Sequence, residues 1–246
     1  MPEPLITLND LLRSSAFAEE HRPGIGWPNE TDPSQIDMHT IKQIYQLAVT
    51  ASRYLATSNF QPIVPQESSV IGLFGFPVNI EYVVTFFALM RLGYTVFVIS
   101  PRMQASSSAT SLDKTGCRFI FYSPTTSVIA HEVGAQQQIK LVSFLSLADI
   151  GKLTSTDAQP PDQYVSENNQ IVLILHSSGS TGLPKLFPMT HRQMLVRSIP
   201  VLYPNNKEFI NSPLYASAGI SFLFFEMHKT APTLSGMKTC PILQKT

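Results

Sequence analysis

The strongest constraint on the fold is a repeated alternation of short apolar runs with stretches of helical spacing. Such alternation implies parallel strands whose connecting helices cover the sheet. The apolar runs are nearly continuous, as expected of parallel strands that are buried on both faces. Strands are predicted at 70–76, 94–99, 118–122, 140–144 and 171–175, and helices at 39–57, 79–92, 103–115 and 126–137. The sequence therefore predicts an α/β fold with a parallel-rich sheet covered by helices.

The two ends of the chain differ from this regular middle part. Leucines after Thr7 predict a short helix, but the prolines and glycines between residues 23 and 33 are typical of irregular chain. Trp27 is the expected anchor of this stretch on the body. The last residues lack any hydrophobic periodicity and have the composition of disordered chain. The predicted division is an N-terminal arm, 1–38, a main body, 39–225, and a disordered tail, 226–246.

A further helix signal follows the last predicted strand. Thr190 and Gln193 have the spacing of a capping box, in which each side chain accepts a hydrogen bond from the other residue's backbone N–H. A helix is therefore predicted from His191 to residue 199, and Asn79 is expected to cap the helix that follows it. Residues 220–225 are apolar and are predicted as one more strand or buried segment.

Composition excludes several classes of protein. Of the 246 residues, 14% are charged, well below the usual level of about 25%, and the formal net charge is zero. Nothing therefore points to nucleic acid or to an acidic membrane surface as a partner. Cys117 and Cys240 make neither a disulfide framework nor a metal cluster, and the histidines are too scattered to form a metal set. The N-terminus does not resemble a signal peptide, so a soluble cytoplasmic protein is expected.

A loop rich in small, hydroxylated and flexible residues follows the strand predicted at 171–175. Its glycines permit close approach of the backbone to a ligand, and successive N–H groups in such a loop form an anion-binding nest. Lys185 adds a cation of the kind that phosphates attract. The candidate phosphate-binding residues are Ser177, Ser178, Gly179, Ser180, Thr181, Gly182 and Lys185, with His176 as a second-tier candidate.

The spacing within this loop excludes a P-loop of the Walker A type. In that motif the lysine directly follows a glycine and precedes the Ser or Thr that binds magnesium. Here two residues separate Gly182 from Lys185, and Leu186 occupies the position of the magnesium-binding hydroxyl. A P-loop kinase or ATPase is therefore disfavoured.

The stretch from Ser177 to Lys185 instead resembles the signature loop of the adenylate-forming, or AMP-binding, superfamily, roughly [ST]-[ST]-G-[ST]-[ST]-G-x-P-K. Thr190 and His191 stand where members often carry Thr-His before a helix. The segment 212–219 is similar to the family's P-L-F-H-x-x-G. The resemblance implies that 39–225 is a partial AMP-binding domain, the N-terminal portion of the large subdomain, and that the tail is non-homologous.

The resemblance implies a two-step reaction. A carboxylate attacks the α-phosphorus of Mg²⁺-bound ATP, which gives an acyl-adenylate and pyrophosphate. The thiol of coenzyme A or of a carrier protein's phosphopantetheine then takes the acyl group. Lys185 and the loop donors would neutralise the β- and γ-phosphates as the leaving pyrophosphate gains charge. The carboxylic acid itself cannot be read from the sequence.

Within the family, the sequences on either side of the loop most resemble those of fungal nonribosomal-peptide-synthetase-like carboxylic acid reductases. His176 before the loop and the stretch 186–191 after it depart from the common K-G-[VA] continuation. The resemblance implies a ligase-type enzyme of secondary metabolism. Its partners would be a small carboxylic acid and carrier-protein and reductase domains that lie outside this chain.

Several of the family's motifs have no counterpart after Gly219. These are an aromatic-Gly-x-Thr-Glu segment, an Asp that binds ribose, and the catalytic lysine of a mobile C-terminal subdomain, so the catalytic residues are unknown. Ala216 replaces a common histidine, and Lys238 and Lys245 lie outside any such motif. We therefore expect a truncated and inactive domain. The alternative function is a nucleotide-phosphate-binding fragment or relic without turnover.

Some side chains have two plausible roles. His176 is equally well explained as a strand-end histidine with a local hydrogen bond or as a ligand contact, whereas His191 is expected to pack in the first turn of its helix. The phenylalanines at 74, 76, 86 and 87 are expected in the core. Those near 222–225 are expected there too, with a minor possibility that one lines an acyl pocket. Cys117 is expected to be buried and inert.

Overall fold

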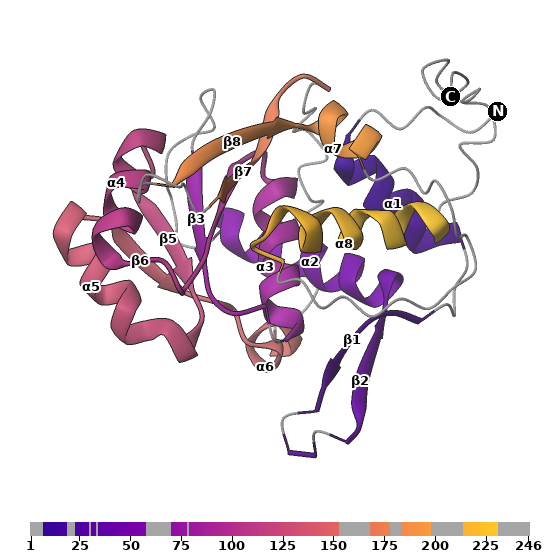
Figure 1. Ribbon diagram of the computed structural model, residues 1–246. Coiled ribbons are helices and arrows are strands. Elements are labelled where there is room, and N and C mark those ends of the chain that lie inside the picture. The colour runs from indigo at the N-terminus through magenta and orange to yellow at the C-terminus, as the bar shows by residue number, and fades with distance from the viewer. Residues whose placement is uncertain are drawn as a thin grey trace.

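The computed structural model describes most of the predicted body of the protein (Figure 1). The described residues are 7–18, 23–29, 31–32, 34–57, 70–77, 79–152, 168–177, 184–197 and 214–230. Most of the predicted tail and most of the Ser/Gly loop lie outside these ranges.

A six-stranded sheet forms the centre of the molecule, in the order β6-β5-β3-β4-β7-β8. All neighbouring pairs are parallel except β7 and β8, which form an antiparallel hairpin. The strands are β3 (Val70–Phe74), β4 (Thr95–Ile99), β5 (Phe119–Tyr122), β6 (Lys140–Ser143), β7 (Ile171–Ser177) and β8 (Lys185–Thr190). The predicted parallel-rich α/β fold is confirmed.

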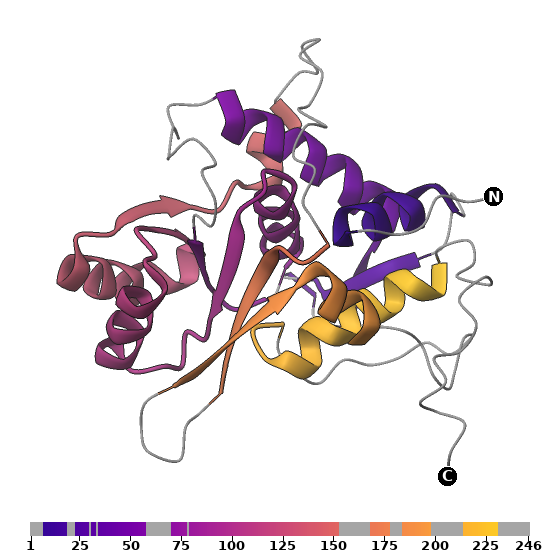
Figure 2. The same ribbon diagram turned by 90° about the horizontal axis from the view of Figure 1, so that it is seen from above.

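Helices cover both faces of the sheet (Figures 1 and 2). One face carries α1 (Leu8–Ala18), α2 (Ile41–Thr57), α3 (Ile80–Arg91) and α8 (Ser217–Thr230). The other face carries α4 (Ala105–Thr115) and α5 (Ser127–Gln137), the latter preceded by a 3-10 turn, η1 (Pro124–Thr126). The short α6 (Leu147–Lys152) and α7 (His191–Arg197) complete the described helices.

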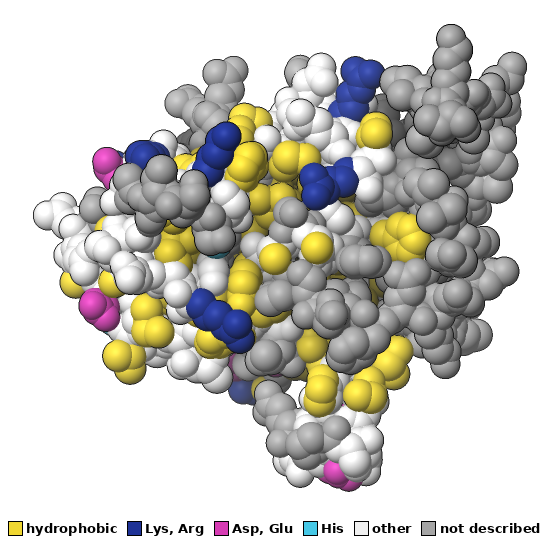
Figure 3. All heavy atoms as spheres, viewed as in Figure 1, with side chains coloured by type: hydrophobic (Ala, Val, Ile, Leu, Met, Phe, Trp, Pro, Cys, Tyr) yellow, Lys and Arg dark blue, Asp and Glu magenta, His cyan; other side chains and the backbone are white. Residues whose placement is uncertain are grey.

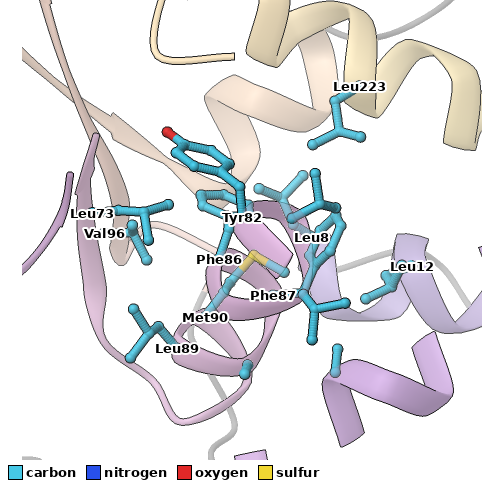
Figure 4. Packing of buried hydrophobic residues seen from close by; sticks show 14 of the residues in the cluster. Leu8, Leu12, Leu73, Tyr82, Phe86, Phe87, Leu89, Met90, Val96 and Leu223 are labelled. Carbon is cyan, nitrogen blue, oxygen red and sulfur yellow. The ribbon is translucent and has the colours of Figure 1, made fainter. Parts of the chain in front are cut away.

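The buried side chains form two clusters, one on each side of the sheet. The larger, which we call the main core, joins the sheet to α1, α2, α3 and α8 (Figure 4). The smaller core joins the sheet to α4 and α5. On β4, Val96 and Val98 lie in the main core and Phe97 and Ile99 in the smaller one. The strands are thus buried on both faces, which is why their sequences lack polar alternation.

Helix α3 lies deepest in the main core. Tyr82, Phe86, Phe87 and Met90 are all buried, and the rings of Phe86 and Phe87 each contact that of Phe224 from α8. The predicted core role is confirmed for Phe74, Phe86, Phe87 and Phe224, whereas Phe76 is only partly buried. Gly93 ends the helix with a φ of 81°, a left-handed conformation that glycine adopts without strain.

The prediction of irregular chain between residues 23 and 33 was wrong in part. Strands β1 (Pro23–Pro28) and β2 (Ile36–Thr40) form an antiparallel hairpin that projects from the body (Figure 1). The prolines stand at the two ends of β1, where a missing N–H is tolerated. Trp27 is buried and donates a hydrogen bond of 3.1 Å from Nε1 to the carbonyl of Pro77, so the predicted anchor is confirmed.

Three other elements differ from expectation. The apolar stretch 220–225 belongs to helix α8, which continues to Thr230, across the boundary expected after residue 225. Helix α6 and strand β8 were not predicted. Asn79 occupies the N-cap position of α3, but its side chain makes no capping hydrogen bond. The division into arm, body and tail stays a prediction.

Candidate functional site

The Ser/Gly loop connects β7 to β8, two strands that pair antiparallel. Ser177, the last residue of β7, pairs with Lys185, the first residue of β8, and His176 pairs with Leu186. Residues 178–183 lie outside the described residues, so Ser178, Gly179, Ser180, Thr181 and Gly182 remain predicted phosphate-binding residues. Antiparallel pairing on both sides of the turn nevertheless fixes where the loop begins and ends.

The loop leaves the sheet at a topological switch point. From β4 the chain crosses through α4 to β5, on the far side of β3, whereas from β7 it turns outward to β8. The connections of these two neighbouring strands thus leave in opposite directions. In open α/β sheets, ligands bind outside the carboxyl ends of strands at such a point. The carboxyl end of β7 is where Ser177 lies.

His176 is the residue that joins β7 to β4 at this end. Its Nε2 accepts a hydrogen bond of 3.1 Å from the backbone N–H of Ser100, and its ring contacts Phe97 edge-on, with centroids 6.4 Å apart. Burial lowers the pKa of His176 below its ordinary value. The local hydrogen bond that sequence reasoning weighed against a ligand contact is therefore present. Ser100 was missed, although the strand predicted at 94–99 ends beside it.

Lys185 lies exposed at the other side of the hairpin. Its Nζ is 5.6 Å from the centre of the Phe187 ring, so the ammonium has a favourable contact with the ring face. Within the part of the chain that the structure describes, no carboxylate lies within ion-pair distance of it. Because no described carboxylate neutralises it, the Lys185 ammonium at the end of the hairpin can bind an anion.

The chain after β8 is fixed by two sets of hydrogen bonds. Thr190 and Gln193 form the predicted capping box, with bonds of 2.9 and 3.2 Å. His191 is 1% exposed, and its Nδ1 accepts a bond of 3.1 Å from the backbone N–H of Leu8 at the start of α1. The predicted packing role of His191 is confirmed.

Among the described side chains on the face seen in Figure 3, charged groups are sparse, and Lys and Arg lie scattered among apolar patches. No group of three His, Cys, Asp or Glu side chains that could hold a metal ion occurs among the described residues. The described helices include none that is long and apolar enough to cross a membrane. Cys117 is buried, and burial raises the pKa of its thiol to about 12, so the nucleophilic thiolate is strongly disfavoured.

Residues 37–242 match the model of the AMP-binding enzyme family, so the chain belongs to that family. The nonribosomal peptide synthetase ascB of Acremonium egyptiacum is 34% identical over 125 residues, which cover 48% of this chain and 11% of that protein. The adenylate-forming reductase Nps11 of Serpula lacrymans is 27% identical over 195 residues, 73% of this chain and 17% of the relative. The chain thus spans a small part of the curated relatives that it matches.

Solved structures support the same fold. The inhibitor-bound N-terminal domain of FACL13 from Mycobacterium tuberculosis superposes with a TM-score of 0.73 at 19% identity, over 92% of this chain and 56% of that one. The N-terminal subdomain of NpsA from Klebsiella oxytoca, in complex with 3-hydroxybenzoyl-AMSN, superposes with a TM-score of 0.71 at 16% identity. The match covers 94% of this chain and 56% of that one. The fold is that of the N-terminal domain of adenylate-forming enzymes.

Proposed function

We propose that this chain provides the ATP-phosphate-binding part of an adenylation domain that activates a small carboxylic acid as its acyl-adenylate. The observation that carries the proposal is the position of the β7–β8 hairpin. Its turn begins at a switch point of the sheet and ends at Lys185, an exposed cation that has no carboxylate partner among the described residues. Membership of the AMP-binding family supplies ATP as the anion.

The two described residues at this end of the hairpin suit a phosphate ligand. Lys185 supplies positive charge, and Ser177, directly opposite in the hairpin, supplies a hydroxyl donor. In the reaction, a carboxylate oxygen bonds to the α-phosphorus as the bond from that phosphorus to the bridging oxygen breaks. The electron pair leaves with pyrophosphate, and Lys185 would stabilise this growing negative charge. Mg²⁺ would be held through the phosphates rather than by an acidic cluster of the described residues.

The acyl acceptor in this proposal is a thiol, from a carrier protein's phosphopantetheine or from coenzyme A. A carrier is favoured because the relatives include a nonribosomal peptide synthetase and adenylate-forming reductases, which also supports a role in secondary metabolism. Carrier and reductase domains would then be the partners of this chain. The alternative is a fragment that binds nucleotide phosphates without turnover.

ATP–pyrophosphate exchange with a panel of aryl and amino acids tests the proposal, together with direct ATP binding by calorimetry. We expect the isolated chain to bind ATP and to catalyse no exchange, in line with the alternative. Acid-dependent exchange that is lost in Lys185→Ala would instead establish turnover by this chain. Failure to bind ATP at all would contradict both forms of the proposal.

A further inference from the structure

Side-chain hydrogen bonds extend the backbone pairing of strands β4 and β7 at both ends. Their parallel register comprises two pairs, Val96 with Leu173 and Phe97 with Ile174. Side chains bracket this short ladder. At one end Thr95 Oγ1 donates to the carbonyl of Ile171 at 2.7 Å, and at the other the imidazole of His176 accepts from Ser100. The His176 ring therefore takes over the pairing of the two strands where the backbone ladder stops.

The surroundings of His176 hold its ring in one orientation. Phe97 meets the ring at 90°, and the backbone of His176 is paired with Leu186 of β8. Because Nε2 accepts the hydrogen bond, the proton of the neutral ring is on Nδ1. A protonated ring has donors at both nitrogens and could not accept from Ser100.

We propose that His176 is a positioning residue for phosphate binding, which holds the end of β7 against β4 only while its ring is neutral. Ser177 follows it directly, and Lys185 pairs with Ser177, so the bond to Ser100 sets where the hydroxyl and the ammonium lie relative to the switch point. His176 therefore acts through its neighbours and is not itself a phosphate ligand. This inference rests on the proposed function.

The burial of His176 favours the neutral ring. Strand β4 carries no charged side chain, Arg102 follows it, and Lys185 is the charged residue of β8; α4, which shares the smaller core with Phe97, carries Asp113 and Lys114. The pKa of His176 is lowered by burial, with no carboxylate opposing this effect. If ATP binds the form with the neutral ring more tightly, linkage requires that ATP binding lower the pKa of His176 further.

The test measures ATP affinity by calorimetry for wild type, His176→Gln and His176→Phe. The Gln side chain places an acceptor near the position of Nε2 but does not titrate, whereas Phe keeps the ring without the acceptor. At about pH 8 we expect the Phe variant to lose about tenfold in ATP affinity, since the N–H of Ser100 loses its acceptor, and the Gln variant to lose less. The exposed His131 on α5 is the matched control, because His131→Gln should keep the wild-type pH profile.

The pH profile separates positioning from packing. Below the pKa of His176, the ATP affinity of the wild type should fall by up to about tenfold per pH unit relative to that of the His176→Gln variant. The variant is the reference because the protonation of ATP itself affects both proteins equally. Nitrogen NMR of the ligand-free wild type should show His176 protonated at Nδ1 alone. If the ratio of the ATP affinities of the wild type and the His176→Gln variant does not change with pH, the inference about His176 is wrong, but the proposed function is not affected. Absence of ATP binding by wild type at about pH 8 would overturn the proposed function, and this inference with it.

Discussion

His191 should make the stability of the protein fall in mild acid. It is buried at the start of α7, and its Nδ1 accepts from the N–H of Leu8, so the folded state holds the ring neutral. Burial, opposed in part by the charge of Asp10, lowers the pKa of His191 from 6.5 to about 4. The unfolded chain takes up a proton below pH 6.5, whereas the folded chain does so only near pH 4, so acid favours unfolding.

The size of the effect follows from the two pKa values. The pKa of His191 is 6.5 in the unfolded chain and about 4 in the folded protein, and this difference corresponds to about 3 kcal/mol of unfolding free energy. The whole of this amount is lost only below about pH 4. Between about pH 8 and about pH 5, where the folded ring is still mostly neutral, the loss is about 2 kcal/mol. This stability is present above pH 6.5 and is lost progressively as the pH falls.

Urea unfolding at the two pH values measures this loss, with the fluorescence of Trp27, the only tryptophan, as the probe. The matched variant is His191→Asn, because the Asn Oδ1 can replace the accepting Nδ1 without titrating. Wild type should lose about 2 kcal/mol more than this variant from about pH 8 to about pH 5. Equal losses in the two proteins would refute the assignment of a buried neutral imidazole.

Four further predictions concern stability and reactivity. In a Cys240→Ser background, the Cys117 thiol should react with a disulfide reagent only as fast as the protein unfolds, since burial raises its pKa to about 12; rapid labelling of folded protein would contradict this. Gly72→Ala should cost about 1–3 kcal/mol by urea unfolding, because a Cβ there would lie 3.0 Å from a side-chain carbon of β5. By contrast, a Cβ added at Gly151 in α6 would have no atom within 4 Å, so Gly151→Ala should stabilise the protein by about 0.5–1 kcal/mol. A loss of stability would argue against the helical assignment of this residue. Thr190→Ala removes a capping bond of 3.2 Å and should cost about 1 kcal/mol in the same assay; no cost would mean that the capping box adds nothing.

The central sheet could be predicted because its strands are buried on both faces and therefore read as continuous apolar runs. The hairpin β1–β2 was missed because prolines and glycines mark irregular chain as well as strand ends and close backbone approach. At Gly24, a Cβ would lie 2.8 Å from the carbonyl of His39, so only glycine fits there. Such a contact depends on the partner strand, which the local sequence does not specify.

Helix α8 was missed for a different reason. Its buried residues Ile220, Leu223, Phe224 and Met227 have helical spacing, but the apolar window at 220–225 is too short to separate a helix from a strand. A longer window that included Met227 would have shown helical spacing and indicated a helix.

For the candidate site, the motif predicted the loop and its lysine, and the structure added the hairpin that frames them. The bond between His176 and Ser100 could not have been predicted, because it joins residues 76 positions apart. Its existence depends on β4 and β7 being neighbours in the sheet, a fact of topology rather than of local sequence.

The most direct test of phosphate binding compares ATP with AMP as ligands for wild type and Lys185→Ala. Only ATP carries the β- and γ-phosphates that Lys185 is proposed to neutralise. The variant should lose about tenfold to a hundredfold in ATP affinity and keep its AMP affinity, whereas Lys152→Ala, which removes an exposed lysine paired with Asp149, should change neither. An unchanged ATP affinity in Lys185→Ala, or an equal loss for both nucleotides, would contradict the account.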